Sequence, residues 1–140
     1  MLVNQIAVFL ENRSGRICDF SRVLKEAGVN IQAMSIADTT EYGILRAITD
    51  DNQKALAALK ANGFNTAATD LIGFQVDDKP GEMYHVLKIL EDAGINIGYL
   101  YSFARTAKKS AVILIKVDDN DAAVKILSDH GIDLVGEGIL

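Results

Sequence analysis

This chain of 140 residues repeats itself, and the repeat limits which folds it can form. The sequence Ala-Gly-Val-Asn-Ile at residues 27–31 recurs as Ala-Gly-Ile-Asn-Ile at residues 93–97, a spacing of 66 residues. Further along, Asp-Asp-Asn at residues 50–52 recurs at residues 118–120, a spacing of 68 residues. Self-similarity at a fixed spacing is typical of one supersecondary unit used more than once. The sequence therefore predicts two domains, residues 1–69 and residues 70–140.

The same series of elements is predicted in each copy. Ile6, Val8 and Leu10 alternate with other residues, as in a strand. Phe20 and Leu24 belong to a row at helical spacing. The strands are expected near residues 5–10, 30–37, 44–49 and 65–69, and then near 72–76, 96–103, 111–117 and 134. The helices are expected over residues 16–27 and 52–63, and then around 83–93 and 124–127.

The predicted order, strand-helix-strand-strand-helix-strand, occurs twice and is that of the split-βαβ, ferredoxin-like unit. We expect an α+β protein of two βαββαβ domains, each with a four-stranded antiparallel sheet, packed as a pseudo-dimer. Packing would cover exposed strand edges and share a core, which units of about 70 residues need. The predicted turns lie around residues 38–43 and, two residues longer, between 105 and 110.

Composition excludes several classes of partner. The formal net charge is −5 and the only adjacent basic pair is Lys108-Lys109, so we expect binding to neither nucleic acid nor membrane. Cys18 is the only cysteine, which excludes an intrachain disulfide and a cysteine-rich metal site. The start of the chain lacks the features of a secretory signal, and no apolar run is long enough to span a bilayer. We therefore expect a cytoplasmic protein without a metal or cofactor.

Other proteins with this order of elements require residues that this chain lacks. RNA-recognition modules need aromatic side chains on a central strand, and residues 43–48 and 111–116 contain none. A soft-metal carrier needs Cys-x-x-Cys in the first loop, which is also absent. An acylphosphatase-like enzyme needs a glycine-rich phosphate loop beside an arginine. Arg13 and Arg16 lie in the right region, but no glycine-rich loop accompanies them. His85 and His130 have no nearby Ser or Cys partner, so we expect no enzyme.

The two strand-to-helix turns carry the clearest functional signal. They read Glu-Asn-Arg-Ser-Gly at residues 11–15 and Asp-Asp-Lys-Pro-Gly at residues 77–81. Each is followed, at matched distance, by Gly-(Val/Ile)-Asn-Ile. In these motifs the whole chain resembles the ACT domain family, whose domains regulate by binding amino acids. The resemblance implies a free amino acid or related metabolite held at the interface between two ACT domains, read out by a regulated enzyme or by a homo-oligomer such as a dimer.

Elementary chemistry supports such a site. A turn that enters a helix offers free N–H groups and a favourable dipole to a carboxylate, and glycine allows close backbone approach. Asparagine offers both a donor and an acceptor, although it can also serve merely as a turn residue. The candidate binding residues are Leu10, Asn12, Arg13, Ser14, Gly15, Asn30, Ile31, Val76, Asp78, Lys79, Gly81, Asn96 and Ile97.

The first copy is also similar to the regulatory ACT domain of phosphoglycerate dehydrogenases, in which a His-Glu-Asn-Arg-Pro-Gly turn and an asparagine of the partner domain hold serine. This resemblance implies that Asn12 faces Asn96 and that Asp78 faces Asn30. The histidine position is Leu10 here and Val76 in the second copy, which favours an apolar amino acid over serine. The alternative is a structural subunit that uses the same interface for assembly without a ligand.

The second strands differ most between the copies. Residues 33–37 read Ala-Met-Ser-Ile-Ala, whereas residues 99–103 read Tyr-Leu-Tyr-Ser-Phe, with the aromatic residues at period two on one sheet face. These aromatics are expected either to pack against a partner or to form the wall of a pocket. Because the copies differ, we expect two unequal sites or one working site.

Overall fold

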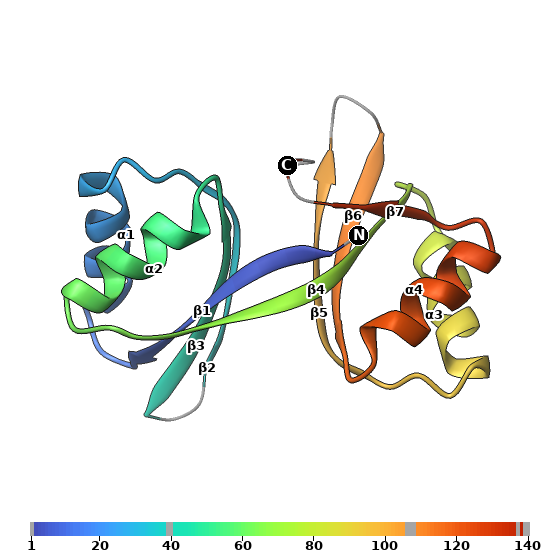
Figure 1. Ribbon diagram of the computed structural model, residues 1–140, viewed down its shortest axis with the longest axis horizontal. Coiled ribbons are helices and arrows are strands. Elements are labelled where there is room, and N and C mark those ends of the chain that lie inside the picture. Colours follow the sequence, from blue (N-terminus) through green and yellow to red (C-terminus); the bar gives the residue numbers. More distant parts are fainter. Residues whose placement is uncertain (1, 39–40, 106–108, 137, 139–140) are drawn as a thin grey trace. The chain divides into compact units, whose positions relative to one another are not determined.

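The computed structural model (Figure 1) describes residues 2–38, 41–105, 109–136 and 138. Its contacts divide the chain into an N-terminal unit, Asn4–Thr69, and a C-terminal unit that begins at Asp70 and also takes in Leu2 and Val3. Each unit has two helices on one face of an antiparallel sheet (Figure 1). The predicted α+β class with two βαββαβ units is confirmed.

In the N-terminal unit the strand order is β2-β3-β1-β4. The central strands are therefore β1 and β3, and β2 is an edge strand. The elements are β1 (Val3–Glu11), α1 (Arg16–Glu26), β2 (Ile31–Asp38), β3 (Tyr42–Thr49), α2 (Asn52–Ala61) and the first part of β4 (Asn65–Asp77).

In the C-terminal unit the strand order is β5-β6-β4-β7, so the rest of β4 takes the place that β1 has in the first unit. The remaining elements are α3 (Glu82–Asp92), β5 (Ile97–Arg105), β6 (Ser110–Val117), α4 (Asn120–Asp129) and β7 (Asp133–Val135).

The register of the strands reproduces the sequence repeat. Val8 lies opposite Leu45, and the residues 66 and 68 positions later, Phe74 and Ile113, lie opposite each other. The register shifts at the start of β2, between Ile31 and Ala33, and it shifts at the matching place in β5. The two units therefore share one backbone plan, down to a β-bulge.

Each unit buries its own hydrophobic core between sheet and helices. In the N-terminal unit the core includes Ile6, Val8, Phe20, Leu24 and Leu59. The core of the C-terminal unit includes Ile72, Phe74, Val86, Leu90 and Leu127. These are the apolar rows that the strand and helix periods predict, because side chains of one period share one face.

Two features differ from the predicted elements or fall outside the described part of the chain. The strands predicted near residues 65–69 and 72–76 form one continuous strand, β4, although Asp70, a residue common in turns, lies between them. Residues 39–40 and 106–108, within the two predicted turns, lie outside the described residues. None of the described helices is both long and apolar enough to cross a membrane.

Candidate functional site

The first helix of each unit begins at a glycine in a left-handed conformation. Gly15 has φ +92° before α1, and Gly81 has φ +92° before α3. A side chain at this φ would strain the backbone, although nothing lies within 4 Å of where a Cβ would be at either position. The glycines are therefore required by the turn, and they leave the start of each helix sterically open.

The helices of each unit differ in how they begin. Asp51 caps α2 by accepting a hydrogen bond from the Lys54 amide at 3.0 Å, and Asp119 caps α4 through the Ala122 amide at 3.0 Å. No side-chain cap is present at α1 or α3 among the described residues. The first amide of each of these helices donates within its loop, Arg16 to the Arg13 carbonyl at 3.5 Å and Glu82 to the Lys79 carbonyl at 3.4 Å. In the part of the chain described, no side chain caps the rest of the first turn, in contrast to α2 and α4.

The first loop places Asn12, Arg13 and Ser14 on the surface. The Asn12 amide donates to the Glu41 carbonyl at 2.8 Å, which ties the loop to the strand that follows β2. Glu11 accepts a hydrogen bond from Arg16 Nε at 2.6 Å. The backbone N–H of Glu11 and this guanidinium lower the pKa of the Glu11 carboxyl, so that it stays ionised.

The second loop has the same backbone contacts and different side chains. The Asp78 amide donates to the Lys109 carbonyl at 3.0 Å, as Asn12 does to Glu41 in the first unit. Lys79 Nζ lies 3.6 Å from Asp77 Oδ2 and 3.5 Å from Glu82 Oε1. The cation of the second loop therefore bridges two carboxylates of its own unit.

The structure separates the predicted asparagines from the loops of their own units. Asn30 follows α1, and Asn96 follows α3, whereas the loops precede these helices. Each helix has 11 residues, and at the standard rise a helix of this length spans roughly 16 Å. Both side chains are exposed, and the Asn30 amide donates to Asp50 Oδ1 at 2.9 Å. One unit by itself therefore cannot bring a loop and an asparagine onto the same small ligand.

The predicted apolar positions have different surroundings. Leu10 is only 1 % exposed and belongs to the core of the N-terminal unit. Ile31 and Ile97 are half-buried against the cores of their units. Val76 is half-buried and lines a pocket. Leu10 and Val76, which match in the repeat, thus differ in the solvent exposure of their side chains.

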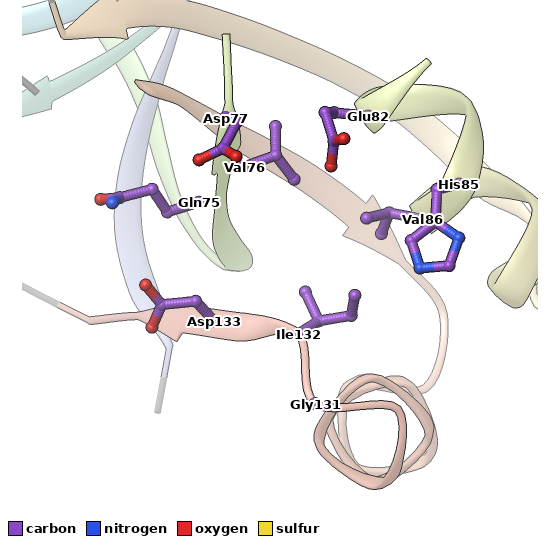
Figure 2. A pocket seen from close by; sticks show the side chains of 9 residues that line it. All are labelled: Gln75, Val76, Asp77, Glu82, His85, Val86, Gly131, Ile132 and Asp133. Carbon is purple, nitrogen blue, oxygen red and sulfur yellow. The ribbon is translucent and has the colours of Figure 1, made fainter. Parts of the chain in front are cut away.

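The pocket lies within the C-terminal unit and has a volume of about 280 Å³. Figure 2 shows Val76, Val86 and Ile132 pointing toward one another, with the carboxylate of Glu82 directed into the same space. The residues that line it come from β4, α3 and the approach to β7: Gln75, Val76, Asp77, Glu82, His85, Val86, Gly131, Ile132 and Asp133.

In the N-terminal unit the corresponding place is filled with larger side chains. Phe20 stands where Val86 does, and Phe64 stands where Ile132 does, and both are buried. The guanidinium of Arg16, which matches Glu82, lies 4.4 Å from the centre of the Phe64 ring. Ring and guanidinium thus stack on each other at the positions that match Ile132 and Glu82, two residues that line the pocket of the second unit.

Sequence reasoning named only Val76 among the residues of this pocket. A signal was present in the repeat, because aligned positions change from Phe to Val and from Phe to Ile. Both changes remove volume, but volume removed from a core is recognisable as a pocket only once the neighbours of each residue are known.

The comparisons with known proteins agree with this architecture. A family model described as an ACT domain pair matches residues 1–140. The chain belongs to the ACT domain pair family. Membership of this family supports a regulatory role. A comparison with the curated proteins found no match.

Solved structures share the fold of this ACT domain pair. Protein BT0572 from Bacteroides thetaiotaomicron is 36% identical, with a TM-score of 0.91, and the match covers 96% of this chain and 92% of that one. The regulatory subunit of aspartate kinase from Thermus thermophilus is 15% identical, with a TM-score of 0.67 and coverage of 91% and 93%. The corresponding subunit from Thermus flavus is 15% identical, with a TM-score of 0.64 and coverage of 92% and 93%. At such low identity the two kinase subunits show likeness of fold alone.

Within the described residues, no group of three or more His, Cys, Asp or Glu side chains could hold a metal ion. What the ACT domain pair does present, twice, is a helix start without a side-chain cap beside a polar loop.

Proposed function

We propose that this ACT domain pair is a non-catalytic cytoplasmic regulator that binds a free amino acid between two ACT domains, residues 1–69 and 70–140. The amino acid's carboxylate would accept hydrogen bonds from the open start of α1 or α3. Asn12 or Asp78 would orient its ammonium group. Asn96 or Asn30 of the other domain would close the site. Val76 would favour an apolar side chain, with branched-chain or aromatic amino acids ahead of serine, whereas Leu10 lies in the core of its own unit.

The observation that carries this proposal is the difference between the helix starts. In both units the second helix is capped by an aspartate, and the first helix begins at an uncapped glycine with free space beside it. A helix start that is open in both copies suits an anionic group. Family membership supports the same conclusion.

The remaining candidate residues have supporting roles in this proposal. Arg13 and Ser14 are exposed in the first loop, and Lys79 is exposed in the second. They would contact the outer part of the ligand, while Ile31 and Ile97 would support the asparagines from the core side. Two asparagines at the far ends of the first helices explain why two domains are needed for one site.

Because the proposed regulator catalyses no reaction itself, its ligand binding must change the behaviour of another molecule or of its own assembly. We propose a regulated enzyme or a change in a homo-oligomer, such as a dimer, as the readout. The alternative is an assembly subunit that uses the same interface with no ligand.

The deciding experiment is thermal unfolding of the purified protein with each of the twenty amino acids and common keto acids. A ligand at one hundred times its Kd adds about 2.7 kcal/mol of stability. For a chain of this length that corresponds to roughly 5–10 °C in Tm. We expect a selective shift with an apolar amino acid.

The variants Asn12→Ala and Asn96→Ala should abolish this shift. Gln53→Ala is the control, because Gln53 is an exposed residue of α2 outside the loops. A shift that survives both asparagine variants would place the ligand elsewhere. No shift with any compound would favour the assembly subunit.

A further inference from the structure

Each unit of this ACT domain pair has an edge strand that is paired on one side. Among the described strands, β2 pairs only with β3, and β5 pairs only with β6. β2 has eight residues and β5 has nine, and neither contains a lysine or a proline. Short length, lysine and proline are common means by which edge strands avoid pairing with another chain. Each edge therefore offers a row of main-chain groups to a further strand.

On the sheet face away from the helices, the side chains of the two edge strands differ in size. In β2 this row reads Ala-Ser-Ala at positions 33, 35 and 37, opposite positions 48, 46 and 44 of β3. In β5 the row reads Tyr-Tyr-Phe at positions 99, 101 and 103, and all three aromatic side chains are half-buried. Small side chains beside large ones let neighbouring strands interdigitate. The two edges are therefore complementary to each other, whereas two copies of β5 would crowd.

One antiparallel register matches the two rows completely. With position 35 opposite position 101, position 33 lies opposite 103 and position 37 lies opposite 99. Opposite residues share a face, so the helix-side residues are matched as well. Ile36, which is 45 % exposed, lies opposite Leu100, which is 38 % exposed, and Met34 lies opposite Ser102. This pairing therefore covers three large apolar side chains that the single chain leaves exposed.

The same register brings each loop of the proposed site to an asparagine. Position 38 lies opposite position 98, close to Asn96, and the hydrogen bond from the Asn12 amide to the Glu41 carbonyl places the first loop at this end of β2. At the other end, position 31 lies opposite position 105. Asn30 precedes position 31, and the Asp78 amide donates to the carbonyl of residue 109. Asn12 thus meets Asn96, and Asp78 meets Asn30.

We propose that β2 of one chain pairs antiparallel with β5 of a second copy of the chain, and that the second copy completes each amino-acid site. The part that concerns the ligand rests on the proposed function, whereas the strand pairing does not. A second copy is the partner because the two complementary rows belong to one sequence, so that two chains supply both. When each β2 pairs with the β5 of the other chain, the assembly closes as a two-fold dimer.

Disulfide cross-linking tests the pairing of the strands. Cys18 is exposed, so the full chain carries Cys18→Ser throughout. Met34→Cys and Ser102→Cys are introduced in separate chains, which are then mixed and oxidised. Opposite residues have Cβ atoms about 4.5–5.5 Å apart, which is close enough for a disulfide after a small adjustment. We expect a covalent dimer in the mixture and little in either variant alone. No dimer in the mixture, or as much dimer in one variant alone, would overturn the proposal.

The mass of the chain in solution gives a second test, made without any amino acid. Sedimentation should show twice the chain mass of 15.1 kDa. Ile36→Lys should raise the Kd of the dimer about tenfold or more, because an ammonium group would be buried beside Leu100. Tyr84→Lys is the control, because Tyr84 is 69 % exposed and lies on α3 rather than on an edge strand. A monomeric wild type, or equal weakening by both variants, would contradict the pairing.

Thermal shifts separate this proposal from the proposed function. A dimer that shows no shift with any amino acid would refute the ligand and leave the strand pairing standing. A selective shift of full size in monomeric Ile36→Lys would show that one chain forms the site by itself. That result would overturn completion of the site by a second copy while leaving the proposed function intact.

Discussion

The two units place different side chains on the same backbone, and the difference decides where a pocket can exist. In the N-terminal unit Leu10, Phe20 and Phe64 are buried together in one core. In the C-terminal unit the matching Val86 is equally buried, whereas Val76 and Ile132 are half-buried and line a pocket. A repeat of this kind lets one copy serve stability while the other gains room for a ligand.

The largest expected effect on stability comes from replacing a residue of one unit by its counterpart in the other unit. Phe20 is completely buried, so Phe20→Val should leave a cavity and lower the free energy of unfolding by about 2–4 kcal/mol. Val86 is also completely buried, so Val86→Phe, the opposite change, should overpack the core of the second unit and cost about 1–3 kcal/mol. Urea unfolding, followed by NMR signals of each unit, measures both values. A loss below about 1 kcal/mol for Phe20→Val would contradict the tight packing of the first core around this ring.

A smaller effect is expected at Gly73, which matches Ala7 of the first unit. A Cβ at Gly73 would lie 2.6 Å from Val135 Cγ2 and 3.2 Å from Val3 Cγ2. Gly73→Ala should therefore overpack the second unit and cost about 1–3 kcal/mol in the free energy of unfolding, measured in urea. The double variant Gly73→Ala/Val135→Ala should remove the steric conflict, and a cost that exceeds the sum of the two single variants would contradict this explanation.

The smallest effect concerns the asparagine that begins the second helix of each unit. In the first unit Asn52 Oδ1 accepts hydrogen bonds from the Thr49 amide at 3.1 Å and from Thr49 Oγ1 at 2.7 Å. In the second unit valine replaces this threonine at Val117, and Asn120 Oδ1 is buried with no partner among the described residues.

Giving the second unit the residue of the first should satisfy this atom. Val117→Thr supplies a hydroxyl that can donate to Asn120 Oδ1, and we expect a gain of about 0.5–1.5 kcal/mol in the free energy of unfolding. Thr49→Val should cost a similar amount, and urea unfolding of both variants checks the pair. A loss of stability in Val117→Thr would mean that the second unit cannot orient the hydroxyl toward the asparagine.

Much of the fold was predictable because local and periodic signals agree. Alternation at Ile6, Val8 and Leu10 marked β1, and the acidic residues before each second helix became its caps, Asp51 and Asp119. The run through β4 was predicted as two strands, because two separate repeats were expected to end and begin there. In the structure a single strand, β4, ends the first repeat and begins the second.

The candidate site was less predictable, because binding depends on distances that no motif contains. The resemblance placed Asn12 and Asn30 on either side of the first helix and paired each with the other domain, and the structure has them at opposite ends of α1. The role of each in binding stays a prediction. Leu10 was named as a pocket wall from its position alone, and the structure buries it in the core.

By itself, the sequence determined that this ACT domain pair contains two βαββαβ units with glycines at the starts of the first helices. Those features follow from periodicity, from the repeat and from the backbone conformations that only glycine readily adopts. Only the tertiary structure showed which residues of the second unit line a pocket. Packing depends on the summed volumes of residues distant in sequence, such as Val76, Val86 and Ile132, and these are known only when the chain has brought them together.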